Sequence, residues 1–281
     1  MGFYSIGLFL FPIILMDDDQ FRKLLEYLDY SWSGYRKVRK GVKKRIRRHM
    51  QQLHCRDISA YLEVLNRQPD IRRNCELLMT VSISRFFRDR RLWEILENRW
   101  LPHIIARNPL KIKVWSAGCG CGQEPYSFKI VWEHLKKHFE SLPQLEVVAT
   151  DRHPRYLEYA LSGVYSLSSL KEVAVEDRAV FFESRKGAKL FVIRDELKSD
   201  VHWKIHHLLT DPPGKDFKVI FLRNNVLTYC RQEARKKAVI SVLNCLTPGG
   251  LFIIGCHETL PFKTDRLIPM DRFPYVFCKT P

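Results

Sequence analysis

The chain has 281 residues, enough for one large domain or two small ones with a proper hydrophobic core. Its 46% hydrophobic and 28% charged residues are typical of an ordinary soluble protein, which excludes the biased compositions of other classes. The net charge of +16 is not ordinary and indicates an acidic partner. Charge alone does not choose among nucleic acid, an anionic membrane surface and an acidic protein.

The cysteines exclude one kind of site. None of the eight forms a C-x-x-C pair, so the sequence predicts no paired metal knuckle and we expect no metal. Cys119 and Cys121 flank a glycine in a glycine-rich loop, where small residues are needed for steric reasons. The sequence shows no credible export signal, so we expect reduced thiols and a cytoplasmic location.

Residues 1–16 form an apolar extension of doubtful status. Phe3 to Met16 is almost wholly apolar, but it is too short to span a bilayer comfortably. It also lacks the basic region and the small-residue cleavage site of a signal peptide. One explanation is that Met16 is the natural start, and another is a short interfacial anchor. We therefore expect no transmembrane segment.

Residues 17–100 are predicted to form a basic, helical N-terminal domain. After the acidic cap Asp17–Asp19, apolar residues recur at helical spacing. The segment Tyr35–His49 is dense in Lys and Arg, contains no acid, and carries an apolar residue at every fourth position from Val38. This pattern predicts a helix with an apolar stripe on one side and a strongly basic face on the other.

Three more helices are expected in this domain. One contains Tyr61–Leu65 and ends near Pro69, and another runs from about Cys75 to Leu78. The third, Phe86–Leu101, is amphipathic, and we expect Pro102 to stop it. The Phe86-Phe87 pair is expected to belong to the core.

Residues 101–111 are predicted to be a linker, and the hydrophobic period changes after it. The expected strands are Ile112–Trp115, Leu145–Thr150, Val201–Ile205, Lys218–Leu222 and Leu251–Ile254, and the expected helices are Pro125–His138, Pro154–Leu161 and Gln232–Leu246. Strands that alternate with helices predict an α/β domain over residues 112–281, with a parallel sheet covered on both faces. Around residues 178–200 the alternation breaks, because Phe181–Arg194 resembles a β-hairpin that turns at Lys186-Gly187. We interpret it as a small β insertion.

A glycine-rich turn joins the first strand to its helix. Gly118, Gly120 and Gly122 allow the backbone to turn sharply and to approach a ligand closely. The second strand ends in Asp151, whose carboxylate can accept both hydroxyls of a ribose. Because the loop lacks the G-x-G-x-x-G spacing, an adenosine cofactor fits better than a dinucleotide. Glu124 could hold the amino group of a methionine moiety, or it is a first-turn helix carboxylate favoured by the dipole.

Five segments together resemble the CheR-type chemotaxis methyltransferases. They are SRFFRD from Ser84, VWSAGCGCGQEPYS from Val114, VVATD from Val147, VIFLRNNVLTY from Val219 and LTPGGLFIIGCHETLP from Leu246. The resemblance runs from about Phe21 to Glu258. It implies a helical N-terminal domain, a class I (Rossmann-like) methyltransferase domain with an inserted β-subdomain, and S-adenosyl-L-methionine as methyl donor. It also implies protein-glutamate O-methyltransferase activity on chemoreceptors.

The resemblance also implies a set of cofactor contacts. Carried over position by position, they fall on Ser82, Ser84, Arg88, Glu124, Asp151, His207, Leu208 and Asn224, beside Gly118 and Gly120 of the loop. Ser82 stands where the family commonly has asparagine, Ser84 where it has threonine, and His207 where it has asparagine. The stretch after Arg223-Asn224 has one residue more than one common form of the motif.

The expected chemistry needs no strong general base, because a glutamate is already ionised at pH 7. Such an enzyme must align the carboxylate oxygen with the methyl group and exclude water. Tyr229 is the best candidate for a hydroxyl on the substrate side, or it is a tyrosine packed on the following helix. Arg88 is a candidate clamp for a cofactor or substrate carboxylate, or it is a solvated charge.

Two rival functions remain open in the sequence. A nucleic-acid methyltransferase is suggested by the overall charge and by Asp211-Pro212-Pro213, although Gly214 replaces the aromatic residue that such a motif needs. A non-catalytic protein that kept cofactor binding is the other. We favour a monomer that docks an acidic helical protein, such as a chemoreceptor cytoplasmic domain, on the basic helix 35–49.

Overall fold

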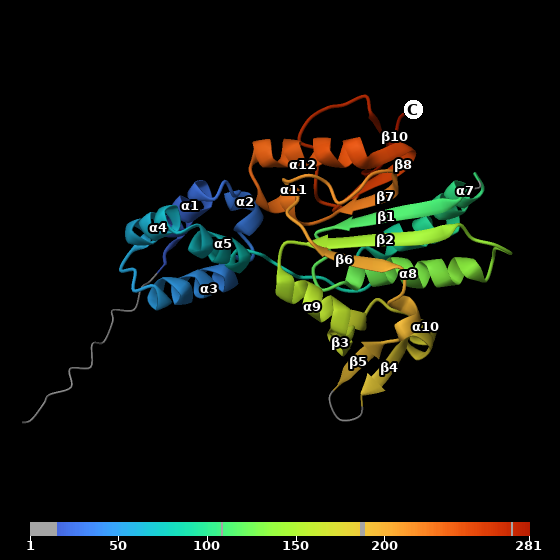
Figure 1. Cartoon of the computed structure of the whole chain (residues 1–281), viewed down its shortest axis with the longest axis horizontal. Coiled ribbons are helices and arrows are strands. Elements are labelled where there is room, and N and C mark those ends of the chain that lie inside the picture. The colour runs from blue at the N-terminus through green and yellow to red at the C-terminus, as the bar shows by residue number, and fades with distance from the viewer. Residues whose placement is uncertain (1–15, 108, 186–188, 271) are drawn as a thin grey trace, which may run out of the picture. The chain divides into compact units, whose positions relative to one another are not determined.

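The computed structural model describes residues 16–107, 109–185, 189–270 and 272–281 (Figure 1). It divides the chain into two compact units, Met1–Thr80 and Val81–Pro281. The expected extension at residues 1–16 lies, apart from Met16, outside the described residues. Within the described part of the chain, no helix has the length and apolar character needed to cross a membrane.

The first unit is built from helices alone. They are α1 (Asp18–Tyr27), α2 (Trp32–Tyr35), α3 (Arg39–Gln52), α4 (Ile58–Arg67) and α5 (Pro69–Leu78). A capping box between Asp17 and Gln20 starts α1, because it satisfies backbone N–H groups that the first turn leaves unpaired. Phe21, Ile46 and Tyr61 are fully buried in the core of this unit.

Helix α3 begins four residues later than its basic pattern predicts. Tyr35 ends α2, and a turn precedes Arg39. The reason is a tertiary contact, since the Tyr35 hydroxyl is buried and donates to the Met79 carbonyl at 3.0 Å. The predicted two-sided character is confirmed, because Val42, Ile46 and Met50 are buried while Lys40 and other cations of the helix are exposed.

The second unit begins at Val81, ahead of the expected boundary at residue 101. Its first helical stretch comprises α6 (Arg90–Ile95), the π-helical η1 (Leu96–Trp100) and α7 (Leu101–Ile105). Leu92, Trp93 and Leu101 belong to the same hydrophobic core as the sheet, and this packing places the stretch in the second unit.

Two expectations about this helical stretch are wrong. It does not begin at Phe86, because Phe87 and Asp89 have left-handed backbone conformations with φ of 51° and 61°. It does not stop at Pro102, which occupies the first turn of α7. A π-helical turn just before this proline allows the helix to continue although proline has no N–H to donate.

A seven-stranded sheet forms the centre of the second unit, in the order β6-β2-β1-β7-β8-β10-β9. Five strands run parallel to one another, namely β1 (Lys111–Ala117), β2 (Gln144–Asp151), β6 (Val201–Ile205), β7 (Phe217–Leu222) and β8 (Leu246–Ile254). Strand β10 (Phe273–Lys279) is antiparallel to both β8 and β9 (Leu267–Met270). The five predicted strands are confirmed, and the α/β, Rossmann-like fold class with them. The sequence interpretation missed β9 and β10.

Helices cover both faces of this sheet (Figure 1). Val114, Val147 and Phe221 point to one face and pack with α8 (Gln123–Lys136) and the α6–α7 stretch. Trp115 and Ile220 point to the other face and pack with α11 (Val226–Tyr229) and α12 (Gln232–Cys245). Alternate residues of buried strands therefore supply two separate cores.

A smaller sheet, ordered β3-β5-β4, is inserted between α9 (Pro154–Ser162) and β6. It contains β3 (Val164–Ser166), β4 (Phe182–Arg185) and β5 (Leu190–Ile193), with η2 (Leu167–Leu170) and α10 (Val175–Phe181) between the first two and η3 (Asp195–Leu197) after the last. The hairpin expected in Phe181–Arg194 is confirmed, since β4 and β5 pair antiparallel. Its expected turn at Lys186-Gly187 lies outside the described residues.

Candidate cofactor and substrate site

The glycine-rich loop follows β1 at the point where the strand order reverses between β1 and β7. Gly118, Gly120 and Gly122 all have positive φ, of 81°, 55° and 87°. A Cβ at Gly118 would overlap the side chain of Asn225, and one at Gly122 would lie 2.8 Å from the Cβ of Ala160. These positions need glycine for both conformation and space, and switch points of this kind are where α/β sheets bind ligands.

Asp151 ties the end of β2 to this loop. Its Oδ2 accepts the Gly120 N–H at 2.9 Å, and its Oδ1 accepts the His153 N–H at 2.9 Å. Burial raises the pKa of Asp151, while the backbone donors of His153 and Gly120 lower it. Each carboxylate oxygen has a second lone pair that can accept a ligand hydroxyl.

Glu124 belongs to a chain of polar contacts that the sequence interpretation missed. Its Oε1 accepts from Ser116 Oγ at 2.7 Å, and its Oε2 accepts from Arg223 Nη1 at 3.0 Å. The Arg223 Nη2 donates to Asp89 Oδ2 at 2.5 Å and to the Arg88 carbonyl at 3.1 Å. The Arg223 side chain is 3% exposed, so one buried cation pairs with two carboxylates, and the group keeps one net negative charge.

A signal for Arg223 was present in the sequence. It follows β7 directly, at the carboxyl end that made the neighbouring Asn224 a candidate. Arginine is also the residue type best suited to join two carboxylates, because its planar guanidinium donates in several fixed directions. Asp89 carried no comparable signal, since its role depends on a fold contact between distant segments.

Arg88 and Asn224 meet at the carboxyl end of β7. The Arg88 Nη2 donates to Asn224 Oδ1 at 3.1 Å, and its Nη1 donates to the Ile83 carbonyl at 2.8 Å. Asn224 has a left-handed φ of 55°. The two residues on either side of Arg88 are left-handed as well, with φ of 51° at Phe87 and 61° at Asp89. Such conformations are uncommon outside glycine and cluster at functional sites.

Tyr229 is the last residue of α11. Burial raises the pKa of the Tyr229 phenol, the positive charge of Arg88 lowers it, and the negative charge of Glu258 raises it. The phenol therefore lies in the electrostatic field of two charged residues of this region. Glu258 is another residue of this region that the sequence interpretation did not single out.

The remaining predicted contacts surround the loop less directly. Ser82 Oγ lies 3.9 Å from Cys121 Sγ and close to Gly120, whereas Ser84 lies half-buried in the same segment. His207 and Leu208 follow β6, whose last residue Ile205 pairs with Asp151. The His207 carbonyl accepts from Thr210 Oγ1 at 2.7 Å, and Leu208 packs against the core below α12.

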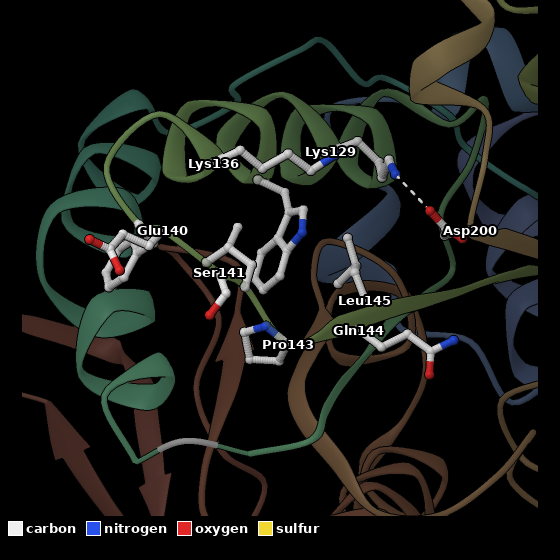
Figure 2. Close-up of a pocket in the computed structure, with 11 residues that line it drawn as sticks. Lys129, Lys136, Glu140, Ser141, Pro143, Gln144, Leu145 and Asp200 are labelled. Carbon is white, nitrogen blue, oxygen red and sulfur yellow. Dashed lines mark ion pairs between the residues drawn. The ribbon is translucent and has the colours of Figure 1, made fainter.

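A cavity lies at the end of the sheet where β2 begins, away from the glycine loop (Figure 2). This cavity of about 430 Å³ is bounded by the end of α8, the segment Phe139–Pro143 and the start of β2. Buried Lys129 points toward Asp200, with 3.5 Å between Nζ and Oδ2 (Figure 2). Lys136 pairs with Glu133 in the same way. Both lysines of the cavity are therefore balanced by a carboxylate, and they give the cavity no preference for a charged ligand.

The described residues include no group of three or more His, Cys, Asp or Glu side chains arranged to hold a metal ion. The candidate site therefore consists of a glycine loop, the carboxylates of Asp151 and Glu124, and a rim formed by Arg88, Asn224 and Tyr229. It can hold a ligand that presents hydroxyls to one carboxylate and a cation to the other.

Comparison with known proteins gives one matching family model and several relatives. Residues 82–275 match the model described as CheR methyltransferase, SAM binding domain. A chemotaxis protein methyltransferase of Listeria innocua is 31% identical over 202 residues, which cover 71% of this chain and 74% of the relative. A chemotaxis protein methyltransferase 1 of Vibrio cholerae is 32% identical over 207 residues, covering 72% and 74%. In Pseudomonas putida, chemotaxis protein methyltransferase Cher2 is 28% identical over 260 residues, covering 89% and 93%.

Proposed function

The chain belongs to the CheR methyltransferase family, and we propose that this S-adenosylmethionine-dependent enzyme forms methyl esters on glutamate side chains of an acidic helical protein. A chemoreceptor cytoplasmic domain is the proposed substrate, because the relatives are named chemotaxis methyltransferases. The observation that carries the proposal is the rim of Arg88, Asn224 and Tyr229 beside the glycine loop, which offers a cation, an amide and a phenol to a carboxylate.

The residues present fit the cofactor. Asp151 is proposed to accept the ribose hydroxyls and Glu124 the methionine ammonium, with Ser82, Ser84, His207, Leu208 and Asn224 as further contacts. The carboxylate oxygens of Asp151 each accept one backbone N–H beside the loop and keep a lone pair for a ligand hydroxyl. The glycines leave the space that a Cβ would fill.

When bound, S-adenosylmethionine supplies an electrophilic methyl group on a sulfonium. The protein's part is to hold an ionised glutamate in line and to exclude water, since glutamate needs no general base at pH 7. Arg88 is proposed to orient the carboxylate and Tyr229 to donate a hydrogen bond to it. Burial keeps the Tyr229 phenol protonated, because it raises the pKa of that group.

Helix α3 is proposed to recruit the acidic substrate. Arg39 and Lys43 pair with Asp18, and Arg45 donates to the carbonyls of Leu78 and Thr80. The exposed cations that remain available to a partner are Arg36, Lys37, Lys40, Lys44 and Arg48. Lys40, Lys44 and Arg48 are spaced four residues apart and form one ridge on the helix, here called the basic ridge.

The proposed location is the cytoplasm, with the protein acting as a monomer. All eight cysteines lie among the described residues and are free thiols, which supports a reducing compartment.

Nucleic-acid methylation has less support. That function would need its catalytic tetrapeptide after β7, whereas Asp211–Gly214 lies before β7 and Arg223–Asn225 lies after it. The position of the motif therefore argues against a flipped base as substrate.

Incubation with labelled S-adenosylmethionine and candidate substrates, followed by alkali, tests the proposal. An ester on a receptor-like protein releases its label as methanol in base. Alkali-stable label on DNA or RNA would contradict the proposed reaction. Cofactor binding without any transfer would instead identify a non-catalytic protein.

A further inference from the structure

Glu258 joins the ends of two neighbouring strands beside the candidate site. It lies in the turn that follows β8, where its own N–H donates to the Gly255 carbonyl at 2.8 Å. Its Oε2 accepts the Gly255 N–H at 2.7 Å and the Asn224 N–H at 3.0 Å. Its Oε1 accepts from Thr228 Oγ1 at 2.5 Å. One carboxylate thus contacts the turn after β8, the turn after β7 and helix α11.

Steric detail shows that this arrangement is tightly fitted. A Cβ at Gly255 would lie 2.8 Å from Glu258 Oε2 and 3.0 Å from Asn224 Oδ1, so only glycine allows the carboxylate to approach. The strands below are held in register, with Leu222 beside Ile254. The carboxylate therefore rests on a rigid base.

The residues that Glu258 holds lie in the rim of the candidate site or directly beside it. Asn224 has a left-handed backbone and accepts from Arg88, so its N–H must be fixed for its side chain to meet that guanidinium. Thr228 immediately precedes Tyr229, and both belong to the short helix α11. Such a short helix gains little stability from its own hydrogen bonds and depends on contacts like the one to Thr228.

We propose that Glu258 is a positioning residue, which fixes Asn224 through its backbone N–H and Tyr229 through Thr228, so that the two face the methyl-transfer site together. This inference rests on the proposed function for its effect on turnover. Glu258 thus acts through two separate contacts, here called the Asn224 branch and the Thr228 branch. The Asn224 branch acts on cofactor affinity, and the Thr228 branch acts on the transfer step.

Three variants of the full-length protein separate the branches. Glu258→Ala removes both, and we expect the cofactor Kd to rise about tenfold and kcat to fall about tenfold to a hundredfold, the loss typical of a misplaced site group. Thr228→Val removes only the second branch, so kcat should fall about tenfold while the Kd stays within about twofold. Glu258→Gln keeps an acceptor for both N–H groups and an amide for the Thr228 hydroxyl, so both quantities should return close to the wild-type values.

Thr247→Val is the matched control. The Thr247 hydroxyl donates to the Phe217 carbonyl across the same pair of strands, but at their amino ends. Its loss should lower the melting temperature as Thr228→Val does and leave kcat and Kd unchanged. Equal kcat losses in both threonine variants would overturn the positioning role, because stability alone would then account for them.

The cofactor measurement distinguishes this inference from the proposed function. Calorimetry with S-adenosylmethionine needs no methyl acceptor. If the wild-type protein binds cofactor but esterifies no carboxylate, the proposed function fails, and the Kd values of the Glu258 variants still decide the Asn224 branch. Unchanged Kd in Glu258→Ala would overturn that branch.

Discussion

Asp151 shows how one side chain combines loop support with ligand recognition. Its carboxylate already accepts two backbone N–H groups, and it keeps further lone pairs. Asp151→Asn preserves the shape but turns one acceptor into a donor that faces a backbone N–H. We expect the S-adenosylmethionine Kd to rise at least about tenfold, since hydrogen bonds to charged groups contribute about 1.5–3 kcal/mol.

Isothermal titration calorimetry measures this effect, with Asp211→Asn as the control. Asp211 is exposed, and its backbone carbonyl accepts a hydrogen bond from His206. A wild-type Kd in Asp151→Asn would refute the assignment of this carboxylate to the ribose.

Arg223 joins two partly buried carboxylates, and a lysine cannot reach both. Arg223→Lys should leave either Glu124 or Asp89 without its cation, and breaking such a buried contact costs about 3–5 kcal/mol. Thermal or urea denaturation should show the loss, and cofactor affinity should fall with it. The control is Arg90→Lys. The exposed ion pair between Arg90 and Glu94 contributes less than about 1 kcal/mol to stability. Similar losses in both variants would contradict the role given to Arg223.

Among single residues, sequence reasoning found those that end strands or belong to the glycine loop. Asp151 and Asn224 were predictable because parallel strands present their carboxyl ends at one edge. Glu258 and Asp89 were not, since their contacts join segments that are distant in the sequence. No local pattern records such a meeting.

At the scale of elements, His134 fastens the inserted region to the main sheet. It lies on α8, and its Nδ1 and Nε2 contact Glu97 of η1 at 3.1 Å and Asp177 of α10 at 2.9 Å. The hydrogen bond to Asp177, which has the larger effect, and the one to Glu97 raise the pKa of His134 to about 9. Both contacts require the protonated ring, which has two donors.

The pH dependence follows from the direction of this shift. The pKa of His134 is raised from 6.5 to about 9 on folding, so its stabilisation is fully present below pH 6.5 and is lost as the pH rises through 9. The contribution is at most roughly 3 kcal/mol. Urea denaturation between pH 6 and 10 should show this loss in the wild type and not in His134→Gln. The control His138→Gln changes an exposed histidine and should keep the wild-type profile.

Element boundaries were predictable where the period of the sequence was clear. The five parallel strands and the hairpin emerged from alternation and length, and so did the order of strands and helices. The start of α3 and the π-helical turn before Pro102 were not predictable, because a buried Tyr35 hydroxyl and core packing decide them. The antiparallel strands β9 and β10 were missed, since they follow a long irregular stretch after β8.

For the whole molecule, the excess positive charge should act on encounter with the substrate more than on chemistry. Lys44→Glu in the basic ridge is expected to raise the KM for an acidic protein substrate several-fold at low salt, and the difference should shrink near 0.5 M salt because of screening. Steady-state kinetics at two salt concentrations measure it. Lys237→Glu on α12 makes the same charge change on another exposed lysine and should have little effect. Equal effects of the two variants would assign the attraction to net charge rather than to α3.

The boundary between the two compact units, at Thr80 and Val81, has a consequence for evolution by recombination. Every residue proposed for the chemistry, from Ser82 onward, lies in one continuous stretch of the sequence, whereas the basic ridge lies ahead of it. Recombination at this point would exchange the part that we propose selects the target and leave the residues proposed for methyl transfer intact. New targets could then arise by fusion of ready-made segments, without stepwise change in the reaction itself.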